Sequence, residues 1–355
     1  MQIKKFLKVA SLMGMAMVVL VGCSNTETQN ETSQQVVEPE VNTESVTPQE
    51  TASEFPVVIE HAYGETIIEE KPERVVTVAW ANQDTALALG VVPVGYSMAN
   101  FGPVDELGMH EWTAEKVREL GEENPNVFQD VAGIDFEAVS DANPDVILAA
   151  YSGLTEDEYT LLSEIAPVVA YPEMPWATYW RDQITINATA MGLKEEGEAY
   201  VAEIDTLIDE KRAEHPNLEG VTGAFIWVDA TDLSSFYLYT PVDTRAAYLV
   251  DLGITFPQEL EEQIGTEDFF VTVSAENIDL LNALDILVVY GNETLLETMQ
   301  ADPLFKTVPA VQRGSVALID EASNIAGAAT PSALSIPAVI DDYMDLLSAA
   351  ADKVQ

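Results

Sequence analysis

The chain contains one thiol, and that thiol is the residue best placed for covalent chemistry. Cys23 is the only cysteine in the 355 residues, and it directly follows Leu20, Val21 and Gly22. A cysteine thiolate is a strong nucleophile, whereas a lone cysteine cannot form an intramolecular disulfide. The sequence therefore predicts a fold without disulfides that is held together by its apolar core.

Residues 1–22 are typical of a secretory signal peptide. Three lysines within the first eight residues precede an apolar run over 9–21, and a small residue stands before the expected cut. The run is shorter than the roughly 20 residues that span a bilayer. With Cys23, the segment resembles a bacterial lipobox, which implies cleavage, acylation of Cys23 and lipid anchoring at the outer face of the bacterial cytoplasmic membrane. An ordinary signal peptide with an incidental cysteine is the alternative.

No other group of residues has the pattern of an active site or of a direct metal site. The chain lacks a Gly-x-Ser-x-Gly elbow, a phosphate-binding loop and a dinucleotide fingerprint. Its three histidines, His61, His110 and His215, do not have metal-ligand spacing. We therefore predict no catalytic residue, no cofactor and no metal ion held directly by the protein.

The composition limits the possible partners. Asp and Glu number 61 against 15 Lys and Arg, which gives a net charge of −46. Nucleic acid is excluded as a partner because contacts with phosphates need lysine and arginine. The acids are spread along the whole chain, which is typical of a solvated surface. The length and the 47% hydrophobic content allow two domains with large apolar interiors, and we expect a monomer.

The patterning predicts a tether followed by two lobes. Residues 23–54 are rich in Ser, Thr, Gln, Asn and Glu, which predicts a flexible acidic tether. Short apolar strands then alternate with helices in an expected N-terminal α/β lobe over 55–173 and a C-terminal α/β lobe over 213–355. Residues 174–212 are helical in pattern, with a break near Gly192. The fold class is thus two Rossmann-like lobes joined by a long rigid helix, with a ligand cleft between the lobes.

Several aromatic residues stand where the expected strands end. The main expected strands cover 75–80, 91–96, 145–150, 224–228, 236–239, 285–290 and 316–319. Ligands of α/β lobes bind beyond the carboxyl ends of strands. This rule places Trp80, Tyr151, Tyr239 and Tyr290 near the cleft, with Arg245 at the start of the helix after Tyr239 and Trp176 near the lobe crossing. Each aromatic residue could instead belong to the core, and Trp176 could pack on the connecting helix.

Two segments have the same arrangement. Asp-Phe-Glu-Ala-Val at 135–139 precedes the strand at 145–150, and Ser-Ala-Glu-Asn-Ile at 274–278 precedes the strand at 285–290. Each predicts a helix with one glutamate near its start, then a turn and a buried strand. The repetition indicates two matched lobes.

Three motifs, taken in order, relate the chain to a known family. They are Lys-Pro-Glu-Arg-Val-Val at 71–76, Ala-Leu-Gly-Val-Val-Pro-Val-Gly at 88–95 and Pro-Ala-Val-Gln-Arg-Gly-Ser-Val at 309–316. From residue 55 onward the chain resembles the substrate-binding lipoproteins of iron–siderophore and cobalamin ABC importers. The iron–siderophore branch is the most similar, because Trp80 is followed by Asn-Gln-Asp-Thr-Ala-Leu at 82–87.

The resemblance implies capture of a ferric siderophore between the lobes and its delivery to an ABC permease dimer with a cytoplasmic ATPase. In that family, one glutamate on each lobe docks into arginines of the permease, and Glu137 and Glu276 match these positions. The alternative is that the two carboxylates are favoured only by the helix dipole. The rigid connecting helix implies a small rotation of the lobes on binding.

The ligand chemistry is less defined by the sequence. Hydroxamate binders of this family commonly carry an arginine shortly before the first docking glutamate, but residues 130–134 are Asp-Val-Ala-Gly-Ile. The few cations near the cleft favour a neutral or cationic ferric hydroxamate over an anionic tricatecholate, with the iron held by the siderophore. A haem or cobalamin carrier of the same fold is the alternative. A lipid-anchored siderophore hydrolase is the enzyme alternative, and no motif supports it.

Overall fold

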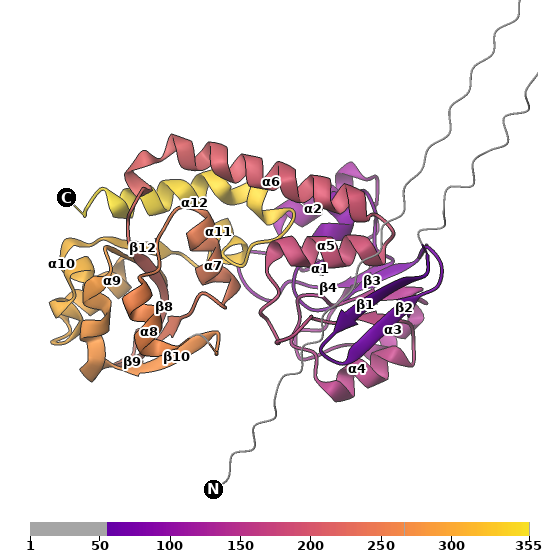
Figure 1. Ribbon diagram of the computed structural model, residues 1–355, viewed down its shortest axis with the longest axis horizontal. Coiled ribbons are helices and arrows are strands. Elements are labelled where there is room, and N and C mark those ends of the chain that lie inside the picture. Colours follow the sequence, from indigo (N-terminus) through magenta and orange to yellow (C-terminus); the bar gives the residue numbers. More distant parts are fainter. Residues whose placement is uncertain (1–54, 266, 355) are drawn as a thin grey trace, which may run out of the picture. The chain divides into compact units, whose positions relative to one another are not determined.

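A computed structural model of the chain describes residues 55–265 and 267–354, which belong to one compact unit (Figure 1). The predicted signal peptide, Cys23 and the tether at 23–54 lie outside the described residues. Within the described part, no helix has the length and apolar character needed to cross a membrane. The body starts with a hairpin, in which β1 (Val57–His61) pairs antiparallel with β2 (Gly64–Ile68).

The first lobe is built on a five-stranded parallel sheet. Its order is β5 (Val127–Phe128), β4 (Gly95–Ser97), β3 (Val75–Thr77), β6 (Val146–Leu148) and β7 (Val168–Val169). Every residue of β3, β4, β6 and β7 is buried, as expected for parallel strands covered on both faces. The helices of this lobe are α1 (Asn82–Ala88), α2 (Glu111–Glu119), α3 (Phe136–Asp141) and α4 (Glu156–Ser163).

The second lobe contains a mixed five-stranded sheet. Its order is β10 (Phe270–Ser274), β9 (Asp232–Tyr239), β8 (Gly223–Asp229), β11 (Ile286–Tyr290) and β12 (Val316–Ile319). β8, β11 and β12 run parallel, whereas β9 is antiparallel to both β8 and β10. Only residues 230 and 231 separate β8 from β9, and so short a connection can join only antiparallel strands.

The helices of the second lobe are mostly short. They are α7 (Thr244–Asp251), α8 (Gln258–Ile264), α9 (Glu293–Ala301), α10 (Pro309–Arg313), α11 (Asn324–Ala328) and the long C-terminal α12 (Ser335–Ala351). Three 3₁₀ segments, η1 (Pro216–Leu218), η2 (Ala275–Ala283) and η3 (Phe305–Thr307), complete the lobe.

Two consecutive helices form the connecting region, and we call them the spine. They are α5 (Trp180–Ala190) and α6 (Lys194–Glu214), separated at Gly192, whose φ is 65°. A Cβ on Gly197 would lie 2.4 Å from the Ala188 Cβ, so this glycine lets α5 and α6 pack closely. The break expected near Gly192 is therefore present, and the spine is two packed helices.

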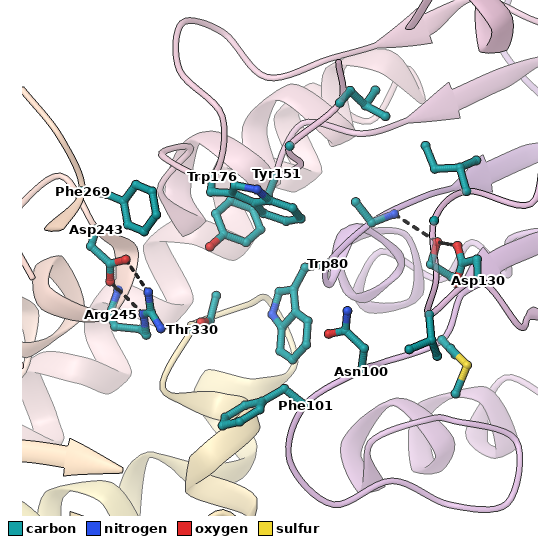
Figure 2. A pocket seen from close by; sticks show the side chains of 18 of the residues that line it. Trp80, Asn100, Phe101, Asp130, Tyr151, Trp176, Asp243, Arg245, Phe269 and Thr330 are labelled. Carbon is teal, nitrogen blue, oxygen red and sulfur yellow. Dashed lines mark hydrogen bonds and ion pairs between the residues drawn. The ribbon is translucent and has the colours of Figure 1, made fainter. Parts of the chain in front are cut away.

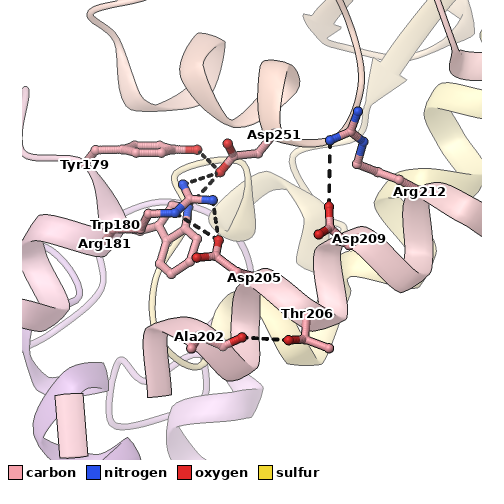
Figure 3. A network of polar contacts seen from close by, with 9 residues as sticks. All are labelled: Tyr179, Trp180, Arg181, Ala202, Asp205, Thr206, Asp209, Arg212 and Asp251. Carbon is pink, nitrogen blue, oxygen red and sulfur yellow. Dashed lines mark hydrogen bonds and ion pairs between the residues drawn. The ribbon is translucent and has the colours of Figure 1, made fainter. Parts of the chain in front are cut away.

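An ion-pair network attaches the spine to the second lobe (Figure 3). Arg181 of α5 donates through Nη1 to Asp251 Oδ2 at 2.7 Å and through Nε to Asp205 Oδ1 at 2.9 Å. Tyr179 and Trp180 also donate to Asp251, at 2.7 and 3.1 Å. One guanidinium thus joins α5, α6 and α7.

Residues 324–334, which we call the strap, connect the lobes a second time. Asn324 Nδ2 donates to Glu111 Oε2 at 2.7 Å, and Ser332 Oγ donates to Asp84 Oδ2 at 2.5 Å. One apolar cluster combines Ala328, Leu334 and Val339 with Leu87, Tyr96, Met109, Trp112 and Val117. Part of the segment expected to belong wholly to the C-terminal lobe, 213–355, therefore packs in the core of the first lobe.

Candidate functional site

A pocket of about 630 Å³ is lined by residues of both lobes. All six residues expected at the cleft line this pocket, namely Trp80, Tyr151, Trp176, Tyr239, Arg245 and Tyr290. Figure 2 shows four of them, Trp80, Tyr151, Trp176 and Arg245. The six residues come from the ends of β3, β6, β9 and β11, from the start of α7 and from the segment before α5. Their contact with a ligand stays a prediction.

Trp80 is positioned by an unusual backbone. The flanking residues Ala79 and Ala81 have φ of 65° and 56°, a left-handed conformation that costs an L-residue about 1–2 kcal/mol. The Ala79 amide donates to Ser97 Oγ at 3.0 Å, and Gln183 Nε2 donates to the Trp80 carbonyl at 3.2 Å. This turn ends the strand at Thr77, not at residue 80 as expected, and Trp80 lies in the middle of the pocket (Figure 2).

The side chain of Asn82 joins the ends of β3 and β6. Its Nδ2 donates to the carbonyls of Val78 and Tyr151, each at 2.9 Å, and its Oδ1 accepts from the Tyr151 amide at 3.1 Å. Asn187 of α5 donates to the same Oδ1 at 3.1 Å. This buried amide therefore holds Trp80 and Tyr151 at neighbouring strand ends and ties both to the spine.

Tyr151 and Trp176 form one wall of the pocket. Their rings meet edge to face with centroids 5.4 Å apart. Trp176 has a φ of 60°, and its amide donates to the Ser152 carbonyl at 2.9 Å. The Tyr151 hydroxyl lies 3.2 Å from Thr244 Oγ1, which links the two lobes. Burial raises the pKa of Tyr151 to about 12, so the hydroxyl stays protonated at neutral pH.

Arg245 and Asp243 lie at the second-lobe end of the pocket. Asp243 caps α7 and accepts from Arg245 Nε at 2.9 Å and from Nη2 at 2.7 Å. The guanidinium lies 4.1 Å from the Tyr239 ring centroid. Burial by itself lowers the pKa of Arg245, but the hydrogen bonds and charge of Asp243 outweigh burial and raise it. Arg245 therefore stays charged, and Asp243 balances its charge.

Acidic groups outnumber basic ones around the pocket. The carboxylates of Asp130, Glu158, Asp243 and Glu321 line it, whereas Arg245 is the one cation among the described lining residues. Glu158 also forms a capping box with Thr155 at the start of α4. The pocket therefore has an excess of negative charge at neutral pH.

The sequence reasoning missed several lining residues. These include Asn100, Phe101, Asp130, Trp227, Phe269 and Thr330. Phe101 meets Tyr290 of the other lobe edge to face at 5.1 Å, and Thr330 comes from the strap. Trp227 had a usable signal, because it stands near the carboxyl end of the expected strand 224–228. In the structure it is 36% exposed and stacks on Tyr237 with ring centroids 5.0 Å apart. No local pattern marked the others.

Glu137 and Glu276 lie away from the pocket lining and are exposed. Glu137 is in the first turn of α3, where Asp135 caps the helix, and Glu276 is in the first turn of η2, where Ser274 caps it. The second segment is not the regular helix that we expected, because it is a 3₁₀ segment with a kink at Asn277. Docking by the two glutamates stays a prediction.

The two-lobed α/β fold and the pocket lined from both lobes define a solute-binding protein. The chain belongs to the periplasmic binding protein family, whose model matches residues 75–322. This match confirms the family that the sequence motifs predicted, and the two-lobed α/β architecture is confirmed as well.

Several relatives whose names state a ligand match most of the chain. The crystal structure of Streptococcus pneumoniae TIGR4 PiaA in complex with ferrichrome has a TM-score of 0.80 and 42% identity, and the match covers 84% of this chain and 100% of that one. The Fe(3+)-citrate-binding protein YfmC of Bacillus subtilis is 25% identical over 88% of both chains. The probable siderophore-binding lipoprotein YfiY of Bacillus subtilis is 24% identical over 90% of this chain and 91% of that one.

Proposed function

We propose that this protein captures a ferric hydroxamate siderophore between its lobes and delivers it to an ABC permease. The observation that carries the proposal is the aromatic pocket with one arginine, which is held by Asp243. A volume of about 630 Å³ suits a compact organic complex. The likeness to PiaA, which was solved with ferrichrome, supports the same ligand chemistry.

Each part of the pocket has a role in this proposal. Asp243 holds Arg245 by Nε and Nη2 and thereby fixes the direction of the guanidinium, which donates to hydroxamate oxygens around the iron. The faces of Trp80, Trp176 and Tyr239 pack on the carbon backbone of the siderophore. The iron is held by the siderophore and not by protein ligands.

Charge favours a hydroxamate over a citrate or catecholate complex. Ferric tricatecholates and ferric citrates are anionic, whereas ferrichrome is a neutral trishydroxamate. Four carboxylates and one guanidinium line the pocket, so an anionic complex is repelled there. The citrate named for YfmC is therefore a less suitable ligand for this chain.

Anchoring and delivery involve residues outside the pocket. Acylated Cys23 would hold the protein at the outer face of the cytoplasmic membrane, with residues 24–54 as the tether. Glu137 and Glu276, exposed on different lobes, would meet basic sockets of the permease, because charged contacts steer and orient such an encounter.

A tryptophan-fluorescence titration of residues 24–355 tests the proposal. The panel contains ferric trishydroxamates, ferric tricatecholates and ferric citrate, with haem and cobalamin as controls. We expect saturable sub-micromolar quenching by a trishydroxamate and weaker quenching by the anionic complexes. Tight binding of a tricatecholate or of ferric citrate without binding of any hydroxamate would overturn the ligand class. Binding of haem or cobalamin alone would assign the chain to a different cargo.

A further inference from the structure

The pocket is electrically different at its two ends. Figure 2 shows Asp243 and Arg245 at one side, Asp130 at the opposite side and Trp80 between them. Arg245 is balanced by Asp243 in a bidentate contact. Asp130 forms no ion pair with any residue of the described part of the chain. A charged ligand therefore meets Arg245, whose charge Asp243 balances, at one end of the pocket. At the other end it meets the carboxylate of Asp130, whose charge no cation of the described residues balances.

Asp130 is a fixed and partly desolvated carboxylate. It follows β5, and its Oδ2 accepts from the Ser97 hydroxyl at 2.5 Å. Ser97 Oγ in turn accepts from the amide of Ala79, which adjoins Trp80. Burial raises the pKa of Asp130, the Ser97 hydroxyl opposes that rise, and the nearby charge of Asp135 adds to it. An ionised group with these surroundings is stabilised when a cation enters the pocket.

We propose that Asp130 is a specificity-determining residue that favours ferric hydroxamates bearing a free ammonium group. The hydroxamate oxygens lie toward Arg245 and the ammonium lies toward Asp130, where it donates a charge-assisted hydrogen bond. The aromatic faces between the two ends accommodate a cation as well as an apolar chain. This inference rests on the proposed function, since it takes the ligand to be a ferric hydroxamate.

A matched pair of ligands tests the role of Asp130. Ferrioxamine B is a linear ferric trishydroxamate that ends in a primary ammonium, and its N-acetyl derivative has the same iron centre without that charge. The experiment titrates both ligands into the wild type and Asp130→Asn. The control variant is Asp141→Asn, which makes the same charge change at an exposed position on α3 outside the pocket lining. This control shows how much of any change in affinity comes from the lower net negative charge of the whole protein.

We expect the wild type to bind the ammonium form about 5- to 20-fold more tightly than the acetylated form. Asp130→Asn should lose most of this preference and keep the affinity for the acetylated form, whereas Asp141→Asn should keep the preference. Equal affinities in the wild type, or an equal loss for both ligands in Asp130→Asn, would overturn the inference and leave the proposed function standing. If neither ligand binds the wild type, the proposed function fails and this inference fails with it.

Discussion

Single backbone positions determine how the pocket presents its aromatic side chains. Ala79, Ala81 and Trp176 all have positive φ although none is glycine. Such conformations are uncommon outside glycine and persist where the surrounding contacts enforce them, which is most often at functional sites. Here the enforcing contacts include the bonds from Ala79 to Ser97 and from Gln183 to Trp80.

Gly153 determines where the Trp176 indole can lie. A Cβ at residue 153 would come within 2.2 Å of Trp176 Nε1. We expect Gly153→Ala to displace the indole and lower siderophore affinity about 3- to 10-fold, because an aromatic contact is lost. Trp176→Ala should have a similar effect, and titration should show that the double variant is no worse than either single one. Independent, additive losses would contradict this account.

Arg245 and Asp243 should be separable by mutation. Arg245→Gln should reduce affinity for a ferric hydroxamate about 10- to 100-fold through loss of a charged donor. The same change leaves the carboxylate of Asp243, which is 3% exposed, without its partner and lowers the melting temperature. Asp243→Asn/Arg245→Gln should recover thermal stability and not affinity. Recovery of both in the double variant would show that Arg245 acts only on folding.

The contact between the strap and helices α1 and α2 includes one buried carboxylate. Asp84 of α1 accepts from Trp112 Nε1 at 3.2 Å, from Thr113 Oγ1 at 2.9 Å and from Ser332 Oγ of the strap at 2.5 Å. Burial raises its pKa from 3.8 to about 6, although the three hydrogen bonds oppose the rise. The packing of the strap therefore includes a titratable group.

The pH dependence of this contact has a definite sign. Between about pH 4 and pH 6 the folded protein binds more protons at Asp84 than the unfolded chain does. The contribution of Asp84 to stability is thus complete below about pH 4 and is lost as the pH rises through about 6. Relative to wild type, Asp84→Asn should gain roughly 3 kcal/mol of unfolding free energy between pH 4 and pH 7. Denaturant titrations across this range check the value, and parallel curves for the two proteins would exclude the shifted pKa.

Glu137 and Glu276 should act in delivery to the permease and not in capture of the siderophore. We expect Glu137→Gln and Glu276→Gln to keep siderophore affinity, because both side chains are exposed and outside the pocket lining. Uptake of radiolabelled iron by cells should fall several-fold for each variant and further for the pair. Glu210→Gln, an exposed change on α6, is the control. Normal uptake by the double variant would remove the docking role.

The body as a whole has two connections between its lobes. The spine is fixed to the second lobe by Arg181, and the strap is fixed to the first lobe by Ser332 and Asn324. The Tyr151 hydroxyl and Thr244 also meet across the pocket. These contacts oppose a wide hinge motion.

Ligand binding should therefore change the relative position of the lobes only slightly. We expect small-angle scattering profiles of the ligand-free and siderophore-loaded protein to superimpose within error. Ser332→Ala, which removes the bond from the strap to Asp84, should increase the difference between the two profiles. A large compaction of the wild type on binding would contradict the two-connection account.

The sequence by itself determined the elements whose signals are local. The break between α5 and α6 at Gly192 and the strand β12 depend on neighbouring residues in the chain, and both were predicted. Trp80, Tyr151 and Tyr290 were predicted at the pocket because the carboxyl ends of parallel strands meet at one edge of a sheet. The same rule placed Tyr239 there, although β9 runs antiparallel. The family followed from short motifs in the right order.

Tertiary structure alone decided the features that depend on distant segments. The strap joins the first lobe through contacts such as Ser332 with Asp84, and Thr330 reaches the pocket with it. Neither the spacing of apolar residues nor the residue types at turns specify which surface such a segment will cover. That surface depends on complementary packing between segments that are distant in the chain. The balance of charge around the pocket was decided in the same way, because Asp130, Asp243 and Glu321 come together only when both lobes are in place.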